Sequence, residues 1–338
     1  MIEEDTSFMT NRERIVNALH FKPVDRLPMV EWAAWWNKTI QRWQAEGLPA
    51  GIDVSGYWKL DDLHQFWISS SAPELAAYKL ENSNAYIRNE ADYEKILPAL
   101  YPEDAVIDNW IEDELVALKA AHEAGEAAVW MSLDGYFWWP RILFGIEPHL
   151  YSFYDYPELY HRICNDLADF QLKIIEEFCS ILAPEFMTIA EDMSYNHGPM
   201  LSEGLFNEFI RPYYEKIIPA LHQHGVKVII DTDGNVMPMI PWLLRCGIDG
   251  ILPLERQSAV DANFLRETYP DLIMLGAFDK RVMKQGEAAM RKEFERLAPV
   301  MQSGGFIPSV DHQTPPDVSL ENYRVYVRLL REYCRKAK

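Results

Sequence analysis

The sequence predicts an α/β fold, specifically a (β/α)8 TIM barrel with an N-terminal helical elaboration. From about residue 126 onward, short apolar stretches alternate with amphipathic stretches at least six times, a pattern typical of parallel strands joined by crossover helices. An alternation that continues to residue 338 favours a barrel over an open doubly wound sheet. No GxGxxG or P-loop glycine pattern follows any of these strands, which argues against a nucleotide-binding fold. No linker rich in Gly, Ser or Pro follows residues 36–125, so we expect residues 1–338 to form a single domain.

Residues 1–125 are interpreted as the elaboration together with the first strand. The segment 10–21 predicts an amphipathic helix with Thr10 or Asn11 as its cap. Residues 29–33 (MVEWA) predict a short buried strand. Further helices are expected at 36–46 and 105–124, and an antiparallel hairpin near 78–88.

Residues 126–338 predict regular β/α repeats. The expected strands are short apolar segments that begin near 127, 185, 226, 249, 271 and 306. The expected helices are a long stretch that ends at Ile181 and the segments 202–225, 237–247, 261–270, 286–305 and 319–336. Glycine closes the second of these helices at Gly225, as is common at helix ends.

Composition excludes several classes of protein. The formal net charge of −20 argues against binding to nucleic acid or to an anionic membrane surface, because both need a basic face. The four cysteines lie far apart, with no CxxC spacing, and we expect no disulfides. No signal peptide or membrane-spanning apolar run is recognised. The sequence therefore predicts a soluble, cytoplasmic protein.

Acidic residues follow nearly every predicted strand. In a barrel the active site lies at the carboxyl ends of the strands, so these side chains should meet at one mouth. They are Glu31, Asp134, Glu191, Asp192, Asp231, Asp233, Glu255, Asp279 and Asp311, the last followed by His312. Any one of them could simply cap the next helix, but the whole set favours a bound cation.

Aromatic residues follow the same strands. Trp36, Tyr136, Trp138, Tyr195 and His197 predict a flat apolar pocket for an aromatic or planar substrate. The alternative is that these rings close a lid or bury the N-terminal elaboration.

Three segments carry a resemblance to the uroporphyrinogen decarboxylase superfamily, which also contains the cobalamin-dependent methyltransferases. They are TNRERIVNALHFKPVDRLP, LFNEFIRPYYEKIIPALHQHG and GGFIPSVDHQTPPDVSLENYRVYV. The resemblance implies a (β/α)8 barrel. True uroporphyrinogen decarboxylases carry an arginine-rich segment after the first strand, whereas this chain has WAAWWNKTIQRW. An acidic mouth would repel a substrate with many carboxylates, so the methyltransferase branch is favoured.

The resemblance also implies a metal site. Coenzyme M methyltransferases of the superfamily bind zinc through His-x-Cys-Gly and a later Cys. Alignment with IDTDGN and with the segment before LEN places Asp231, Asp233 and His312 at these positions. All three can bind a divalent metal, with zinc expected first and manganese or another ion left open. The alternative is a metal-free acid pair that shares a proton.

These observations predict a corrinoid-dependent methyltransferase. A methyl group would move between an O-methyl donor, such as an aryl methyl ether, and methylcobalamin or another corrinoid on a partner protein. Glu191 or Glu255 would donate a proton or complete the metal shell. The methyl donor, the direction of transfer and the oligomeric state stay open.

Two alternatives remain. One is a decarboxylase of a tetrapyrrole or a smaller aromatic acid, with Lys280, Arg141 or Arg211 holding the carboxylate. The other is a corrinoid or tetrapyrrole binding protein without turnover.

Overall fold

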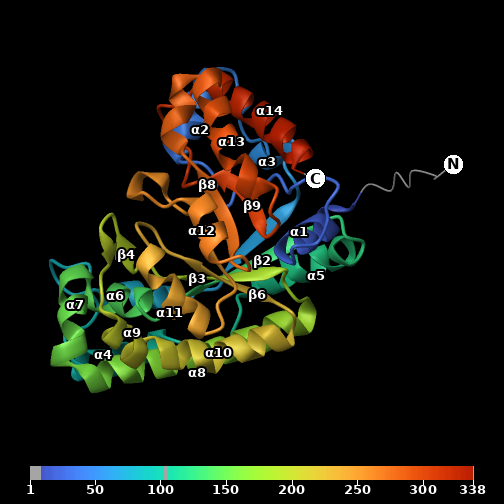
Figure 1. Cartoon of the computed structure of the whole chain (residues 1–338). Coiled ribbons are helices and arrows are strands. Elements are labelled where there is room, and N and C mark those ends of the chain that lie inside the picture. Colours follow the sequence, from blue (N-terminus) through green and yellow to red (C-terminus); the bar gives the residue numbers. More distant parts are fainter. Residues whose placement is uncertain (1–8, 103–105, 338) are drawn as a thin grey trace. The chain divides into compact units, whose positions relative to one another are not determined.

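The structure is a computed structural model, and it describes residues 9–102 and 106–337 (Figure 1). The chain divides into two compact units. Unit 1 comprises Met1–His64, Ala121–Ala128 and Gly250–Lys338, and unit 2 comprises Gln65–Ala120 and Val129–Asp249.

Unit 2 is built on parallel strands. Strand β2 (Ala128–Asp134) pairs with β3 (Phe186–Ala190), which pairs with β6 (Lys227–Asp231), both in parallel. Strand β1 (Leu63–Trp67) leads into Ile68, whose backbone N–H donates to the carbonyl of Ser132 in β2. A two-stranded antiparallel hairpin, β4 (Ser194–Tyr195) and β5 (Gly198–Pro199), follows β3.

Helices follow or precede these strands in unit 2. They are α4 (Glu90–Ile96), α5 (Asn109–Glu123, which ends in unit 1), α6 (Trp138–Phe144), α7 (Ile146–Asp155), α8 (Pro157–Ile181), α9 (Glu203–Phe209), α10 (Arg211–Gln223) and α11 (Ile240–Arg245). Short 3-10 helices are η1 (Pro73–Tyr78), η2 (Leu97–Ala99) and η3 (Met237–Met239).

Unit 1 contains the other parallel strands. They are β7 (Gly250–Leu252), β8 (Ile273–Phe278) and β9 (Phe306–Val310), paired in that order. Its helices are α1 (Asn11–Leu19), α2 (Asn37–Ala45), α3 (Val54–Trp58), α12 (Ala262–Thr268), α13 (Glu287–Met301) and α14 (Leu320–Lys336), with 3-10 helices η4 (Arg256–Ser258) and η5 (Lys280–Gln285).

The predicted α/β class is confirmed in both units. Every position of β2, β3, β8 and β9 is buried, as expected for parallel strands covered on both faces. The predicted cap of α1 is also confirmed, because Thr10 and Glu13 form a capping box. Within the described ranges, no helix has the length and apolar content needed to cross a bilayer.

The predicted first strand at 29–33 is wrong, and the eight-stranded barrel is not confirmed. Seven longer strands are present in the described residues, and the region around Met29 contributes none. Its backbone donors are used differently: Met29 N–H donates to the Asp61 carboxylate (2.9 Å), and Leu27 N–H donates to the carbonyl of Cys334 (3.1 Å). A segment whose donors bind side chains and a helix end cannot also join a strand ladder.

The predicted hairpin near residues 78–88 is also wrong. Leu80 N–H donates to the Ala85 carbonyl within a single turn, and the N–H groups of Tyr86 and Ile87 both donate to the carbonyl of Leu143. These bonds attach the segment to the end of α6 and leave no cross-strand ladder.

Two predicted long helices are interrupted. The stretch that ends at Ile181 is divided into α6, α7 and α8, with Gly145 at a positive φ of 82° between the first two. The 202–225 segment is divided at Ile210, and Pro212 lies in the first turn of α10. Proline fits the first turn of a helix, where its missing N–H would have no intrahelical partner in any case.

Candidate functional site

The carboxyl ends of three strands in unit 2 bring acidic residues to one edge. In the strand register, Asp134 of β2 and Asp231 of β6 both lie beside Ala190 of β3. Glu191 and Asp192 follow directly, and their N–H groups donate to the backbone carbonyl of Asp231 (2.9 and 3.4 Å). The predicted gathering of acids at strand ends is therefore present within this unit.

Asp231 is at the centre of an acidic cluster with Asp192 and Asp233. Burial raises the pKa of the Asp231 carboxyl well above its ordinary value, and the nearby charges of Asp192 and Asp233 raise it further. The Asp233 N–H also donates to the Asp192 carboxylate (3.5 Å). A divalent cation would relieve this repulsion, so the carboxylates fit an oxygen-binding ion in charge and in donor type.

The complete predicted ligand set is not assembled within either unit. Among residues 9–102 and 106–337, no three His, Cys, Asp or Glu side chains are arranged to hold a metal ion. His312 belongs to unit 1, where its Nδ1 accepts the N–H of Gln313 (2.8 Å) and its ring meets Trp32 edge to face. In the neutral ring the proton is then on Nε2, so ligation through Nε2 would require that hydrogen bond to change. The metal site stays a prediction.

A tight turn holds the acidic loop against the β4–β5 hairpin. Gly234 has a φ of +85°, and a Cβ built there would lie 2.6 Å from the Cα of Tyr195. Asn235 N–H donates to the carbonyl of Tyr195 (2.9 Å), and Ser194 Oγ donates to the carbonyl of Asp233 (2.5 Å). The turn therefore needs glycine both for its conformation and for the close approach of the two backbones.

We expect Gly234→Ala to destabilise the protein by about 1–3 kcal/mol and to weaken any ligand binding at this loop. Gly286→Ala is the matched control, because Gly286 has a similar φ of +89° but nothing within 4 Å of its built Cβ. Urea denaturation gives the free energy of unfolding of each variant. Gly286→Ala reports the cost of the backbone strain alone, and any larger loss in Gly234→Ala reports the clash with Tyr195. An equal loss in both would show that the contact with Tyr195 does not matter.

Glu191 ties the loop after β2 to the end of β3. Its carboxylate accepts the N–H groups of Tyr136 (2.9 Å), Phe137 (2.7 Å) and Trp138 (3.2 Å), and the hydroxyl of Tyr214 (2.6 Å). Burial raises the pKa of the Glu191 carboxyl to about 7, and these hydrogen bonds oppose the shift. The group is fully buried, so in this structure it orders the start of α6 and reaches no solvent.

Gly135 is required for this arrangement. A Cβ on Gly135 would lie 2.1 Å from the carboxyl carbon of Glu191. The glutamate therefore occupies the space that a side chain at 135 would take.

The predicted aromatic residues divide by exposure. Tyr136 is fully buried; its ring packs on Tyr213 and Tyr214, and its hydroxyl donates to Gln171 Oε1 (2.7 Å). It therefore presents no surface to a ligand in this structure.

Trp138 and the hairpin residues are more accessible. Trp138 is partly exposed, and the Arg141 guanidinium stacks over its ring at 5.2 Å. Tyr195 is half exposed and meets His197 edge to face. Trp138, Tyr195 and His197 all lie in unit 2. Trp36 is also exposed, but it is the N-cap of α2 in unit 1.

The strand ends of unit 1 hold a second charged cluster. Lys280 Nζ lies 3.2 Å from Glu255 and 3.9 Å from Asp311. The Asp311 carboxylate also accepts the N–H groups of Arg256 and Lys280 (3.0 Å each), and burial raises its pKa to about 6. Lys280 is therefore already paired with carboxylates, and Asp311 is engaged with the loops after β7 and β8. The Asp279 carboxylate accepts the N–H of Arg281 and so caps η5. For this residue the structure therefore agrees with helix capping, the simpler alternative to cation binding.

Several residues of these networks were not predicted. Tyr214, Gln171 and Ser70 each bind a strand-end acid or its backbone: Ser70 Oγ donates to Asp134 (2.7 Å), and Gln171 donates to the Asp134 carbonyl (2.6 Å). Burial raises the pKa of the Asp134 carboxyl to about 6. Nothing in the local sequence distinguishes these partners from ordinary helix or turn residues.

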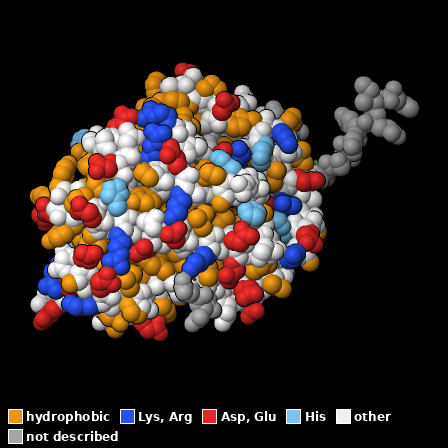
Figure 2. Space-filling model, turned by 90° about the horizontal axis from the view of Figure 1, so that it is seen from below, with side chains coloured by type: hydrophobic (Ala, Val, Ile, Leu, Met, Phe, Trp, Pro, Cys, Tyr) orange, Lys and Arg blue, Asp and Glu red, His pale blue; other side chains and the backbone are white. Residues whose placement is uncertain are grey.

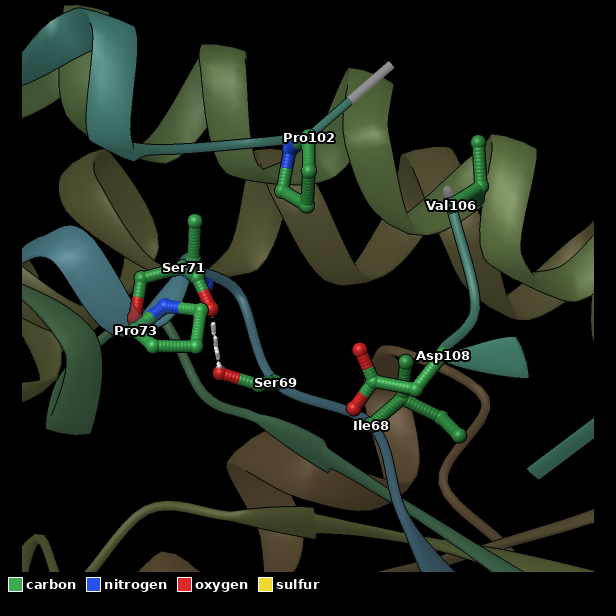
Figure 3. A pocket seen from close by; sticks show the side chains of 8 residues that line it. Ile68, Ser69, Ser71, Pro73, Pro102, Val106 and Asp108 are labelled. Carbon is green, nitrogen blue, oxygen red and sulfur yellow. Dashed lines mark hydrogen bonds between the residues drawn. The ribbon is translucent and has the colours of Figure 1, made fainter. Parts of the chain in front are cut away.

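A separate pocket lies beside the end of β1 in unit 2 (Figure 3). Ser69 and Ser71 are joined there by a hydrogen bond, with Asp108 and Pro102 on the other sides. None of the predicted site residues lines it.

Comparison with known proteins identifies the family. Residues 142–333 match uroporphyrinogen decarboxylase (URO-D). This match covers more than half of the chain, and the chain belongs to the uroporphyrinogen decarboxylase family. No curated protein sequence is similar enough to count as a match.

A solved structure with the same fold is found among the comparisons. A methyltransferase from Methanosarcina mazei superposes with a TM-score of 0.67 at 14% identity, over 96% of this chain and 99% of that one. At this identity the likeness establishes a shared fold. A GH113 β-1,4-mannanase (TM-score 0.42, 11% identity, 91% of this chain and 100% of that one) and a hyperthermophilic endo-β-1,4-glucanase (0.35, 10%, 92% and 94%) are too dissimilar to carry an argument.

Proposed function

We propose that this protein is a methyltransferase that moves a methyl group between an O-methyl donor and a corrinoid held by a partner protein, with the assistance of a divalent metal ion. The observation that carries the proposal is the cluster of Asp192, Asp231 and Asp233 at the carboxyl edge of unit 2, in which the pKa of Asp231 is strongly raised. Such a concentration of negative charge suits a cation-assisted reaction and opposes a polycarboxylate substrate. Membership of the family and the shared fold with a methyltransferase support the same choice.

Asp231 and Asp233 would hold the metal ion at the carboxyl edge of unit 2. When bound, the ion would polarise the ether oxygen as a Lewis acid, and the reduced corrinoid would supply the nucleophile for the methyl group. Asp192, beside both carboxylates, would add negative charge that strengthens cation binding.

The remaining residues of unit 2 would orient the donor. Trp138 and Tyr195 present accessible aromatic rings suited to a planar molecule. Glu191 acts on this surface indirectly, because its carboxylate fixes the N–H groups at the start of α6. We assign it as a positioning residue, and the departing oxygen would take its proton from water.

The test is a turnover assay with purified, metal-loaded protein, cob(I)alamin and a series of aryl and alkyl methyl ethers. We expect the absorbance of methylcobalamin to appear with at least one donor, together with one equivalent of the demethylated alcohol. The absence of methyl transfer with every donor, both to free cob(I)alamin and in the reverse direction from methylcobalamin, would contradict the proposal.

Decarboxylation is the second candidate. Arg141 favours it, because this half-buried cation lies over Trp138 and could hold a carboxylate on the same aromatic surface. Arg141 Nη1 also donates to the Asp192 carbonyl (3.3 Å), which keeps it at the acidic edge. Release of carbon dioxide from an aromatic acid, without methyl transfer, would select this function.

A further inference from the structure

Helix α7 exposes an apolar face. Ile146 (67% exposed), Leu150 (37%), Tyr151 (59%) and Tyr154 (70%) lie on one side of the helix. The opposite side is fixed to the interior, where His149, Ser152 and Phe153 are buried. An exposed apolar patch of a few hundred Å² is about as large as the largest patch on a typical monomer, and such patches are often functional. We call these four residues together with Glu147 the α7 patch.

The α7 patch is on the segment that follows the acidic edge of unit 2. Strand β2 ends at Asp134, α6 and α7 follow, and α8 then leads back to the start of β3, as Figure 1 shows. In a β/α unit, residues inserted between a strand and its return helix lie on the carboxyl side of the sheet. The α7 patch therefore belongs to the same side of unit 2 as Asp192, Asp231 and Asp233.

The helix that carries the α7 patch is firmly supported. The ring of His149 contacts Phe137 at 4.5 Å between centroids, and its Nε2 is 3.2 Å from the Tyr160 hydroxyl. Phe153 stacks on Tyr160 at 4.5 Å. A rigid exposed surface loses little conformational entropy on binding, which favours its use in recognition.

A carboxylate lies within the α7 patch. At about 100° per residue, Glu147 projects between Tyr151 and Tyr154. Glu147 has no ion-pair partner among the described residues, and no Lys or Arg occurs between Ile142 and His161. An acid between tyrosine rings suits a cationic side chain, since the rings add cation–π attraction to the ion pair.

The negative charge of the α7 patch helps to decide between two candidate partners, a second copy of this chain and a separate protein. A second copy of this chain, packed about a two-fold axis with antiparallel helices centred on Tyr151, would place Glu147 opposite Asp155 of its neighbour. Like charges would then meet at both ends of the contact. On the molecular face that Figure 2 shows, acidic and basic side chains are interspersed. A separate protein with basic residues around an apolar centre fits better.

We propose that the α7 patch is the docking surface for the protein that carries the methyl-accepting corrinoid, an inference that rests on the proposed function. Its four apolar side chains expose about 500 Å², somewhat less than the roughly 800 Å² per partner of a standard interface. An interface of this size is typical of transient encounters, and a carrier must leave after each transfer. The carrier should present an Arg or Lys to Glu147, with apolar side chains against Tyr151 and Tyr154.

The test compares two acceptors: free cob(I)alamin, and cob(I)alamin bound to a purified corrinoid carrier protein that the wild-type enzyme uses. Glu147→Lys and Tyr154→Ala should each lower kcat/KM with the carrier by at least about tenfold, mainly through a higher KM. Both should leave the rate with free cob(I)alamin within about twofold, because neither residue lies in the acidic cluster. Added salt should raise the carrier KM of the wild type more than that of Glu147→Lys.

The matched controls are Glu295→Lys and Phe264→Ala, which change exposed residues on helices of unit 1. They should leave both rates unchanged. Equal carrier rates in wild type and both α7 variants would overturn the docking surface while leaving the proposed function intact. A wild-type dimer in sedimentation equilibrium that Tyr154→Ala converts to a monomer would assign the surface to a second copy instead. Failure of the wild type with both acceptors would overturn the proposed function, and the docking surface with it.

Discussion

Glu191→Ala is expected to destabilise the protein by about 3–5 kcal/mol, because each buried donor that loses its acceptor costs about 1–3 kcal/mol. The substitution deletes the acceptor for three backbone N–H groups at the start of α6 and for the Tyr214 hydroxyl. Those donors are buried and would lose their hydrogen bonds without gaining water. Urea denaturation followed by circular dichroism measures the loss.

Two further variants make the result specific. Glu191→Gln keeps the shape but directs an NH2 group at donors, so it should lose about half as much stability. Glu176→Ala removes an exposed acid of α8 and should change stability by less than about 0.5 kcal/mol. If Glu191→Ala were as stable as Glu176→Ala, Glu191 would not be the anchor of this loop.

Asp231→Asn is expected to abolish most metal binding and to lower methyl transfer by at least about 100-fold. The wild type should retain about one divalent ion per chain, measured by mass spectrometry of the metal after dialysis. Asp113→Asn, at an exposed position of α5, is the control and should retain its metal.

The metal-free alternative gives a different result for the same variant. If Asp231 is only part of an acid cluster, Asp231→Asn removes repulsion with Asp192 and Asp233. Because the folded-state pKa of Asp231 is raised, its native carboxyl holds a proton at pH values where the unfolded chain has lost it. The wild type then loses stability as pH rises above the ordinary aspartate range. Asp231→Asn would be more stable than wild type at pH 7, the gain would vanish at low pH, and metal content would not change.

The sequence was sufficient to predict the α/β class, because parallel strands that are buried on both faces appear as short runs of apolar residues. Strands such as β8 and β9 are apolar at nearly every position, and the helices after them are amphipathic. The segment around Met29 shows the limit. It has the same apolar composition as a strand, but its hydrogen bonds go to Asp61 and to the end of α14. Only long-range contacts reveal such a difference.

Part of the candidate site could also be predicted. The strand-end positions of Asp134, Asp231 and Glu191 follow from the β/α pattern, and the structure brings these three residues to one edge of unit 2. What each carboxylate binds could not be predicted. Tyr214 reaches Glu191 from α10, and Gln171 reaches β2 from α8. These are single polar residues within amphipathic helices, where neither periodicity nor spacing marks a partner.

The division of the chain into units has a consequence for synthesis on the ribosome. Unit 2 is drawn from two neighbouring stretches that end at Asp249, whereas unit 1 combines the beginning of the chain with its last part. The Trp32 indole, for example, donates to the carbonyl of Val310 (2.7 Å), and Trp43 donates to that of Val318 (2.9 Å). Unit 2 can therefore assemble while translation continues, but the tryptophans of the first segment must wait for the final strand and helix. A nascent chain stalled after β8 would expose these indoles, and this is the stage at which we expect chaperones to be needed most.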